Sequence, residues 1–236
     1  MEQDRPRQTE KPIPEMPERA PKPKMAVFGG SFDPIHNGHL FIAGSLLRSG
    51  LADEVLFVPA KNPPHKADLE LTPGADRLAM LQKATAAHPG LSVSDIELER
   101  DDGPSYTIDT METLSRVFTE HRLLFVMGMD SLRDLSGWYR SGELVNRFDF
   151  LVYPRPGVRI PSSVELNPHF GPRNTKKLLD AVVDLPLLPI SATAVRAAVA
   201  RGGSLAGLVS DGIVDYIRKA RLYRPSSPAP PPSTIS

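Results

Sequence analysis

Residues Gly29–Leu40 have the sequence GGSFDPIHNGHL and join a predicted strand to a predicted helix. The short apolar run Met25–Phe28 precedes them and predicts a buried strand, and Leu40–Leu47 has the pattern of a helix. Glycines at such a junction let backbone N–H groups approach an anion closely, because no side chain intervenes. A strand, a glycine turn and a helix N-terminus together form the place where a doubly wound sheet binds phosphate.

Two histidines stand in this stretch, His36 and His39, three positions apart. That spacing puts both rings on one face of a first helical turn, and we expect Gly38 to leave this face open to a bulky ligand. Imidazoles there can donate hydrogen bonds to phosphate oxygens, and a neighbouring phosphate would favour their protonated forms. A metal pair is the alternative for the histidines, but no further ligand has helical spacing to them. A plain tight turn is the alternative for the glycines.

The sequence on either side predicts an alternation of strands and helices. Strands are expected over Val55–Val58, Leu91–Leu98, Leu123–Met127, Phe148–Tyr153 and Val182–Leu188, and helices over Asp76–Ala87, Tyr106–Phe118, Ala192–Arg201 and Gly212–Arg221. Residues Gly157–Lys177 lack a clear period and are expected to be loop. Short apolar strands alternating with helices indicate an α/β fold, a doubly wound parallel sheet, with a small helical C-terminal part.

Composition narrows the class of protein. The 236 residues include 28 basic and 28 acidic side chains, so phosphate neutralisation alone would not hold a nucleic acid. The chain has no cysteine, which excludes disulfides, thiolate metal sites and cysteine nucleophiles. No secretory signal is visible, and the apolar runs are too short to span a bilayer. We therefore expect a cytoplasmic protein without nucleic-acid or membrane partners.

Proline marks both ends of the chain. Of the 25 prolines, 6 lie in residues 1–24 and 5 in residues 225–236. Neither segment can bury enough apolar surface to offset its ordering entropy, so both are predicted to be disordered tails. One domain is expected between them, over residues 25–224.

Two further segments carry groups suited to anions. Ser191–Arg196 opens a predicted helix, where Ser191 or Thr193 can act as the cap and Arg196 can face an anion. The alternative is a capped helix with an exposed arginine. Stiff prolines in Pro59–Lys66 fix the path of a loop that carries Lys66, a point charge suited to phosphate, or else a solvated surface lysine.

Two more segments carry groups suited to a nucleotide. The N–H groups near Tyr106 and Thr107 begin a predicted helix and are free to hold a carboxylate, unless that turn is simply capped. Asp130 follows a predicted strand, where it could accept hydrogen bonds from ribose hydroxyls or act as an N-cap. Trp138 lies in a polar stretch and could be a platform for a pyridine ring or part of the core.

The string GGSFDPIHNGH resembles the signature G-G-S-F-D-P-x-H-x-G-H of the nucleotidyltransferase superfamily with paired histidines, relatives of class I aminoacyl-tRNA synthetases. The segment ISATAVR, which ends at Arg196, resembles the second family motif, I-S-x-T-x-x-R. Within the superfamily, residues 25–224 resemble the bacterial nicotinate mononucleotide adenylyltransferases. Ser31 stands where many relatives have threonine, and Ala192 where many have serine.

The resemblance implies a Rossmann-like nucleotidyltransferase fold and a role for each matching residue. It implies ATP binding by Gly29, Gly30, Ser31, Phe32, His36, Gly38, His39, Gly128, Asp130, Ser191, Thr193 and Arg196. It implies acceptor binding by Lys66, Tyr106, Thr107 and Trp138, and catalysis by His36, His39, Lys66 and Arg196. Mg²⁺ is expected to arrive with ATP, because no dedicated carboxylate cage for a metal is visible.

The implied reaction transfers the adenylyl group of ATP to nicotinate mononucleotide and releases pyrophosphate. Two alternatives stay open at this point. One is a related transferase that acts on nicotinamide mononucleotide, phosphopantetheine or glycerol phosphate, and the other is a nucleotide-binding module without turnover. The sequence also leaves a homo-oligomer open.

Overall fold

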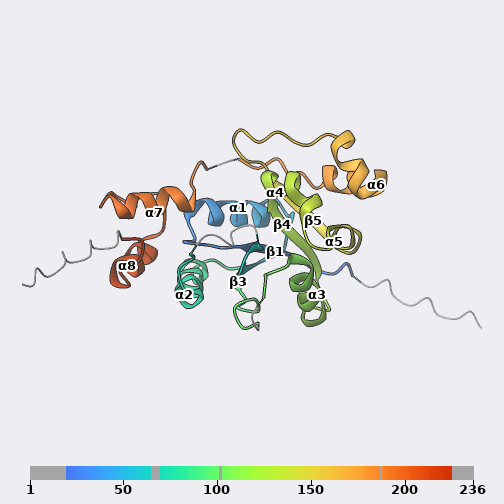
Figure 1. The fold of residues 1–236 in the computed structure, drawn as a ribbon. Coiled ribbons are helices and arrows are strands. Elements are labelled where there is room, and N and C mark those ends of the chain that lie inside the picture. The colour runs from blue at the N-terminus through green and yellow to red at the C-terminus, as the bar shows by residue number, and fades with distance from the viewer. Residues whose placement is uncertain (1–19, 65–69, 101–102, 187, 225–236) are drawn as a thin grey trace, which may run out of the picture.

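A five-stranded, all-parallel sheet forms the centre of the computed structural model of this chain, which describes residues 20–64, 70–100, 103–186 and 188–224 (Figure 1). The strands lie in the order β3-β2-β1-β4-β5. Their bounds are Lys24–Gly30 (β1), Glu54–Pro59 (β2), Leu91–Val93 (β3), Arg122–Gly128 (β4) and Asp149–Tyr153 (β5). The prediction of a doubly wound parallel sheet is confirmed.

Helices cover both faces of the sheet. They are Asn37–Arg48 (α1), Gly74–Thr85 (α2), Thr107–Val117 (α3), Met129–Asp134 (α4), Ser141–Arg147 (α5), Ser163–Asp180 (α6), Ala192–Ala200 (α7) and Asp211–Lys219 (α8), with a 3₁₀ turn, η2, over Leu135–Gly137. Helices α1, α2, α7 and α8 contribute to the core on one face, and α3 to α6 to the core on the other. No helix in the described part of the chain combines the length and the apolar character needed to cross a bilayer.

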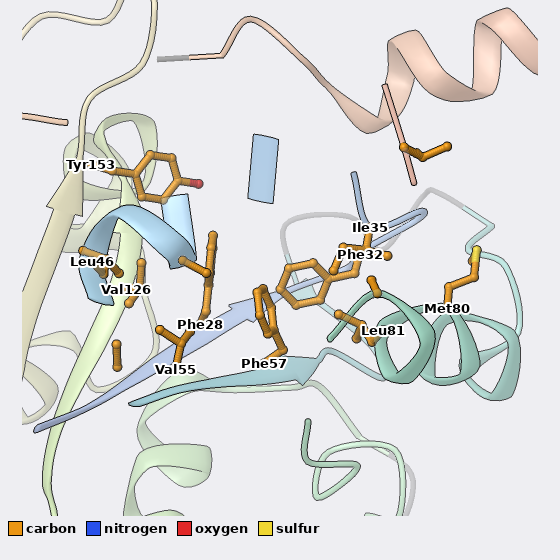
Figure 2. Close-up of a cluster of buried hydrophobic side chains, with 14 of the residues drawn as sticks. Phe28, Phe32, Ile35, Leu46, Val55, Phe57, Met80, Leu81, Val126 and Tyr153 are labelled. Atoms are coloured by element: carbon orange, nitrogen blue, oxygen red, sulfur yellow. The ribbon is translucent and has the colours of Figure 1, made fainter. Parts of the chain in front are cut away.

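Side chains of β1 alternate between the two faces of the sheet, so this strand contributes to both hydrophobic cores. Ala26 and Phe28 pack on the face of α1, while Met25 and Val27 pack on the face of α3. Figure 2 shows the first of these cores, in which the rings of Phe28 and Phe57 stack with centroids 5.4 Å apart. Because both faces of β1 are buried, its sequence is a continuous apolar run, as parallel strands require.

The strand order places a switch point beside the Gly29–Leu40 stretch. From β1 the chain goes outward through β2 to β3, and then crosses to β4 on the other side of β1. Gly30 ends β1 and Gly128 ends β4, so the two glycines lie at the same edge of the sheet. Doubly wound sheets bind ligands in the crevice at this point, between strands whose connections leave in opposite directions.

Three sequence predictions of local structure are corrected. The strand predicted over Leu91–Leu98 ends at Val93, after which the chain turns. The strand predicted over Val182–Leu188 is wrong, because Val182 forms only an isolated parallel bridge with Val152, and Pro186 lacks an N–H for a sheet ladder.

The loop predicted over Gly157–Lys177 is also wrong, because α6 runs from Ser163 to Asp180. Two prolines in this helix and the non-helical Gly171 obscure its period in the sequence. A capping box of Ser162 and Glu165 marks where the helix begins.

Candidate active site

His36 and His39 lie together at the N-terminus of α1, directly beyond the end of β1. Their rings stack with centroids 3.7 Å apart and an interplanar angle of 20°. The backbone N–H of His36 donates to Nδ1 of His39 over 3.3 Å. This bond places the proton of a neutral His39 on Nε2. The prediction that both rings share one face of the first turn is therefore confirmed.

His36 is deeply buried and stays neutral at physiological pH. Its exposed fraction is 7%, and its Nδ1 atom is buried without a hydrogen-bond partner in the protein. Burial lowers its pKa from 6.5 to about 4, and the positive charge of Arg155 acts in the same direction. An anion bound next to the ring would reverse this effect, because it favours the charged imidazolium.

The glycines of the motif allow close packing around this pair. A side chain at Gly38 would come within 3.0 Å of the His36 ring and 3.5 Å of the carbonyl oxygen of Ile190. The His36 ring and Ile190 thus occupy the direction in which a side chain at position 38 would point, which explains why glycine stands there. A Cβ at Gly30 would lie 3.1 Å from the Phe32 ring, and one at Gly29 would lie 3.3 Å from Phe125.

Asp33 connects the motif to the C-terminal part of the chain. Its carbonyl oxygen accepts a 2.6 Å hydrogen bond from Arg196 in α7, and its buried carboxylate accepts one of 2.6 Å from the hydroxyl of Tyr223. Ser191 caps α7 by accepting from the N–H of Ala194, and Thr193 accepts a 3.4 Å bond from Arg196. The structure therefore places Arg196, Thr193 and Ser191 beside the loop that leads into His36.

Arg77, in α2, fixes the other side of the same loop. It is 2% exposed and donates to the carbonyl oxygens of Ser31, Ala60 and Thr72 at 2.8 to 2.9 Å. These bonds join the segment after β1 to the end of β2 and to the start of α2. Burial lowers the pKa of Arg77, while the nearby Asp33 carboxylate acts in the opposite direction.

Asp130 and Arg155 form an ion pair at the end of β4. The distance from Asp130 Oδ2 to Arg155 Nη1 is 3.1 Å, and Asp130 Oδ1 is buried without a partner. Gly128 is the N-cap of α4, so Asp130 belongs to the first turn and is not the cap. A Cβ at Gly128 would lie 2.5 Å from Asp130 Oδ1, which explains why glycine occupies this position.

Two of the residues expected to hold the acceptor, Tyr106 and Thr107, lie at the N-terminus of α3. Tyr106 is the N-cap residue and Thr107 the first helical residue. The Tyr106 ring stacks on Tyr139, with centroids 4.3 Å apart. Trp138, in the same segment as Tyr139, is half-buried and turns its ring edge-on to Phe125.

A second loop lies against this helix start. The hydroxyl of Ser105 accepts bonds of 3.1 Å from the N–H groups of Lys61 and Asn62, and the N–H of Ser105 donates to the carbonyl oxygen of Asn62. A hollow of about 750 Å³ is lined by this loop, by Pro104 and by the start of α2. Lys66, predicted to bind the acceptor and to act in catalysis, lies outside the described residues.

Three residues of this region were missed by sequence reasoning. Arg155 follows β5 at the ligand-bearing edge of the sheet, and the rule that site residues follow strand ends would have found it. Arg77 and Tyr223 gave no signal, because an arginine in an amphipathic helix and a tyrosine near a chain end have no special spacing.

The arrangement of sheet, motif and C-terminal helix is that of a nucleotidyltransferase. The family described as cytidylyltransferase-like matches residues 27–198, and the chain belongs to this family. A probable nicotinate-nucleotide adenylyltransferase of Exiguobacterium sibiricum is 40% identical over 202 residues, covering 85% of this chain and 98% of that protein. One of Thermomicrobium roseum is 37% identical over 201 residues, covering 85% and 92%. Within the family, the chain belongs with the bacterial nicotinate-nucleotide adenylyltransferases.

Solved structures agree on the fold. The chain resembles the Plasmodium falciparum nicotinic acid mononucleotide adenylyltransferase complexed with NaAD, with a TM-score of 0.67 at 20% identity, over 85% of this chain and 97% of that one. A putative nicotinate-nucleotide adenylyltransferase of Vibrio parahaemolyticus gives a TM-score of 0.61 at 18% identity, over 86% and 97%. At these identities the likeness establishes the Rossmann-like nucleotidyltransferase fold.

Proposed function

We propose that this protein transfers the adenylyl group of ATP to nicotinate mononucleotide, a step of NAD biosynthesis. The phosphate oxygen of nicotinate mononucleotide forms a bond to the α-phosphorus of ATP, and the bond from that phosphorus to the bridging oxygen breaks. Nicotinate adenine dinucleotide and pyrophosphate leave. The names of the relatives, which this chain matches over most of their length, support this acceptor.

The strongest support for the proposal is a hydrogen bond between two distant parts of the chain. Arg196 donates to the carbonyl oxygen of Asp33, three residues before His36, although 163 residues separate the two partners in the chain. A guanidinium and two imidazoles from opposite ends of the sequence therefore border one region at the carboxyl edge of the sheet. Three such groups suit a triphosphate whose charge must be neutralised as pyrophosphate leaves.

The phosphate nucleophile is already ionised at neutral pH, so the reaction needs no general base. Catalysis then consists of alignment and charge stabilisation, and alignment alone can contribute on the order of 7–11 kcal/mol. In this proposal His36, His39, Lys66 and Arg196 stabilise the transferring group and the leaving pyrophosphate. His39 presents its Nε2–H as a donor, because its Nδ1 already accepts from the backbone.

Each substrate is assigned its own set of residues. ATP would contact Gly29, Gly30, Ser31, Phe32, Gly38, Gly128, Asp130, Ser191 and Thr193, in addition to the two histidines and Arg196. The acceptor would contact Lys66, Tyr106, Thr107 and Trp138. The N–H groups of the first turn of α3, from Thr107 onward, suit the nicotinate carboxylate, whereas the Tyr106 N–H donates to the carbonyl oxygen of Pro104. The half-buried Trp138 ring suits the pyridine.

Magnesium would enter as part of the ATP complex. Among the described residues no group of three or more His, Asp or Glu side chains has the geometry of a metal site. Phosphate oxygens and water would then supply most of the ligands, as Mg²⁺ prefers in nucleotide sites. The cytoplasmic location, the lack of nucleic-acid and membrane partners, and a homo-oligomer stay predictions.

A pyrophosphate-release assay tests the proposal. Purified protein is given ATP or CTP together with nicotinate mononucleotide, nicotinamide mononucleotide, phosphopantetheine or glycerol phosphate. We expect the largest kcat/KM with ATP and nicotinate mononucleotide, and formation of the dinucleotide. A preference for another acceptor would reassign the substrate, and no release with any pair would leave only a nucleotide-binding module.

A further inference from the structure

Arg140 directly follows the Trp138–Tyr139 segment and is the N-cap residue of α5. Its backbone is left-handed, with φ 51° and ψ 35°, which arginine rarely adopts. Such a conformation persists only where surrounding contacts hold it. The contacts of the Arg140 side chain therefore hold this backbone conformation and, with it, the position of the segment.

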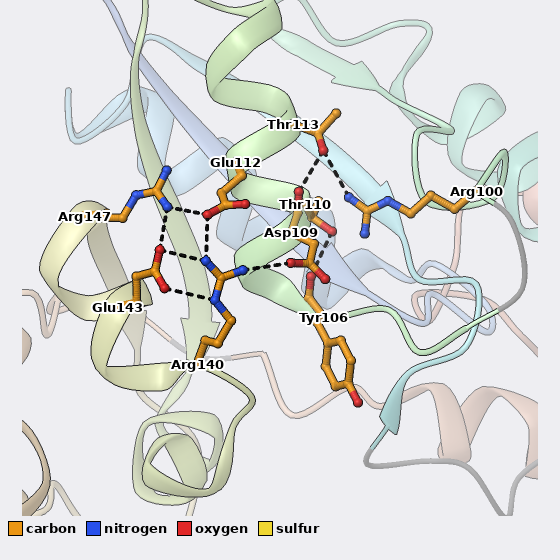
Figure 3. Close-up of polar contacts among 9 residues, drawn as sticks. All are labelled: Arg100, Tyr106, Asp109, Thr110, Glu112, Thr113, Arg140, Glu143 and Arg147. Atoms are coloured by element: carbon orange, nitrogen blue, oxygen red, sulfur yellow. Dashed lines mark hydrogen bonds and ion pairs between the residues drawn. The ribbon is translucent and has the colours of Figure 1, made fainter.

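The Arg140 guanidinium lies among three carboxylates from two helices (Figure 3). It contacts Asp109 at 3.3 Å and Glu112 at 3.1 Å in α3, and Glu143 at 2.7 and 2.9 Å in α5. Arg147 also contacts Glu112 and Glu143. We call these five residues the α3–α5 clamp. A planar guanidinium can donate in several directions at once, which an ammonium cannot do with the same geometry.

The clamp does not offer charge to an anionic substrate. Its three carboxylates outnumber its two guanidiniums, so the cluster as a whole carries a net charge of −1. All of the donors described for Arg140 are directed at protein carboxylates. The arrangement thus suits a device that joins two helices and not a phosphate site.

The clamp lies next to the aromatic part of the acceptor region. Tyr139 immediately precedes Arg140, and it is 52% exposed although its ring stacks on Tyr106. Tyr106 is the N-cap residue of α3, the same helix whose first turns carry Asp109 and Glu112. Figure 3 shows Tyr106 beneath this first turn, on the side of Asp109. Two separate contacts, a ring stack and an ion cluster, therefore hold the Trp138–Tyr139 segment against the start of α3.

We propose that Arg140 is a positioning residue that fixes Trp138 and Tyr139 over the start of α3 and thereby sets the affinity for the acceptor. This inference rests on the proposed function, because it assigns the acceptor ring to that place. Most of the residues assigned to ATP lie around the histidine turn and α7, and only Gly128 and Asp130 lie on the segment that leads to Trp138. The effect of Arg140 should therefore fall mainly on the acceptor.

Two substitutions test this role by changing the guanidinium in different ways. Arg140→Gly removes the guanidinium and suits the left-handed conformation, and Arg140→Lys keeps the charge with fewer donors. The matched control is Arg122→Gln, which breaks an exposed pair of 2.6 Å with Asp149 at the opposite end of β4. We expect Arg140→Gly to raise the KM for nicotinate mononucleotide about tenfold, with the KM for ATP changed less than about twofold. The KM of Arg140→Lys for nicotinate mononucleotide should lie between those of the wild type and of Arg140→Gly. Both KM values of Arg122→Gln should match those of the wild type.

The single tryptophan supplies a second readout that needs no turnover. Trp138 is the only tryptophan of the chain, so its fluorescence reports on this segment alone. We expect acrylamide to quench it more strongly in Arg140→Gly than in the wild type or in Arg122→Gln. Raising NaCl from about 50 mM to about 500 mM should shift the wild type toward the variant, since exposed ion pairs are screened.

Unchanged quenching in Arg140→Gly would overturn the proposal, and so would an equal rise of the KM for both substrates. If the wild type turned over no acceptor, the proposed function would fail on the pyrophosphate assay. The quenching measurement would still decide whether Arg140 holds the segment.

Discussion

His36 and His39 have different environments although they belong to one turn. His36 is buried with an unpartnered nitrogen, whereas His39 has its Nδ1 fixed by a backbone N–H and its ring edge-on to Phe28 and Phe32. A fixed, singly oriented imidazole is suited to donate to charge that develops in the transition state. For a buried neutral imidazole such as His36, binding of an anion next to the ring favours protonation.

The first prediction concerns His39, whose ring orientation is fixed. His39→Ala should lower kcat about a hundredfold or more, as the loss of one transition-state donor does, with a much smaller change in ATP affinity. Steady-state kinetics and equilibrium titration with ATP measure the two effects separately. A variant with full turnover would remove His39 from the mechanism.

The buried histidine carries a prediction about pH. Because its pKa is about 4 in the folded protein and 6.5 for a solvated histidine, the unfolded chain binds more protons between these values. Stability should thus be complete above about pH 6.5 and fall by on the order of 3 kcal/mol as pH drops to about 4. Urea titrations of the wild type and of His36→Gln should differ in slope over this window. NMR should give a His36 pKa of about 4 in the free protein and a higher pKa with ATP bound. A pKa of about 6.5 in the free protein would contradict the burial argument.

At the scale of elements, α6 shows how a helix can be present without a visible period. Gly171 interrupts it with φ 71° and ψ 164°, a conformation that suits glycine, between Pro168 and Pro172. Gly171→Ala should therefore cost about 1–3 kcal/mol of unfolding free energy.

Gly142 in α5 provides the matched control for this prediction. It lies in a regular helix with open space around it, so Gly142→Ala should be neutral or stabilise by up to about 1 kcal/mol. Thermal unfolding of both variants measures the difference. Equal effects of the two substitutions on thermal unfolding would mean that alanine adopts the backbone conformation at position 171 without strain.

The sequence predicted the elements whose side chains obey a simple period and missed the others. The runs before Gly29 and Gly128 are unbroken apolar strands, and the first of them led directly to the histidine pair. The prediction of a strand from Val182 was wrong because apolar residues next to a proline can pack in the core without forming the hydrogen-bond ladder of a sheet. Arg77 could not be predicted, because its three partners are backbone carbonyls that meet only after folding.

At the scale of the whole molecule, two residues of the C-terminal part of the domain converge on Asp33, near its N-terminal end. Tyr223 donates to its carboxylate and Arg196 to its carbonyl oxygen. Tyr223→Phe leaves a buried carboxylate oxygen without this donor, which should cost about 1–3 kcal/mol of stability. It should also lower kcat/KM for ATP, because the loop that leads into His36 is less well held.

Tyr216→Phe separates the two effects. Tyr216 donates a 2.8 Å bond to a different carboxylate, that of Asp76, and joins α8 to α2. We expect a loss of stability without a change in kcat/KM, measured by urea unfolding and by pyrophosphate release. If both tyrosines affected the kinetics equally, the link to Asp33 would have no special role.

The bond between Tyr223 and Asp33 also has a consequence for synthesis of the protein. A chain still attached to the ribosome makes its histidine turn early but lacks Tyr223, which follows α8, until that helix has been made. Full activity should therefore wait until Tyr223 has been made, and a product cut short before this tyrosine would lack the bond that holds the loop leading into His36.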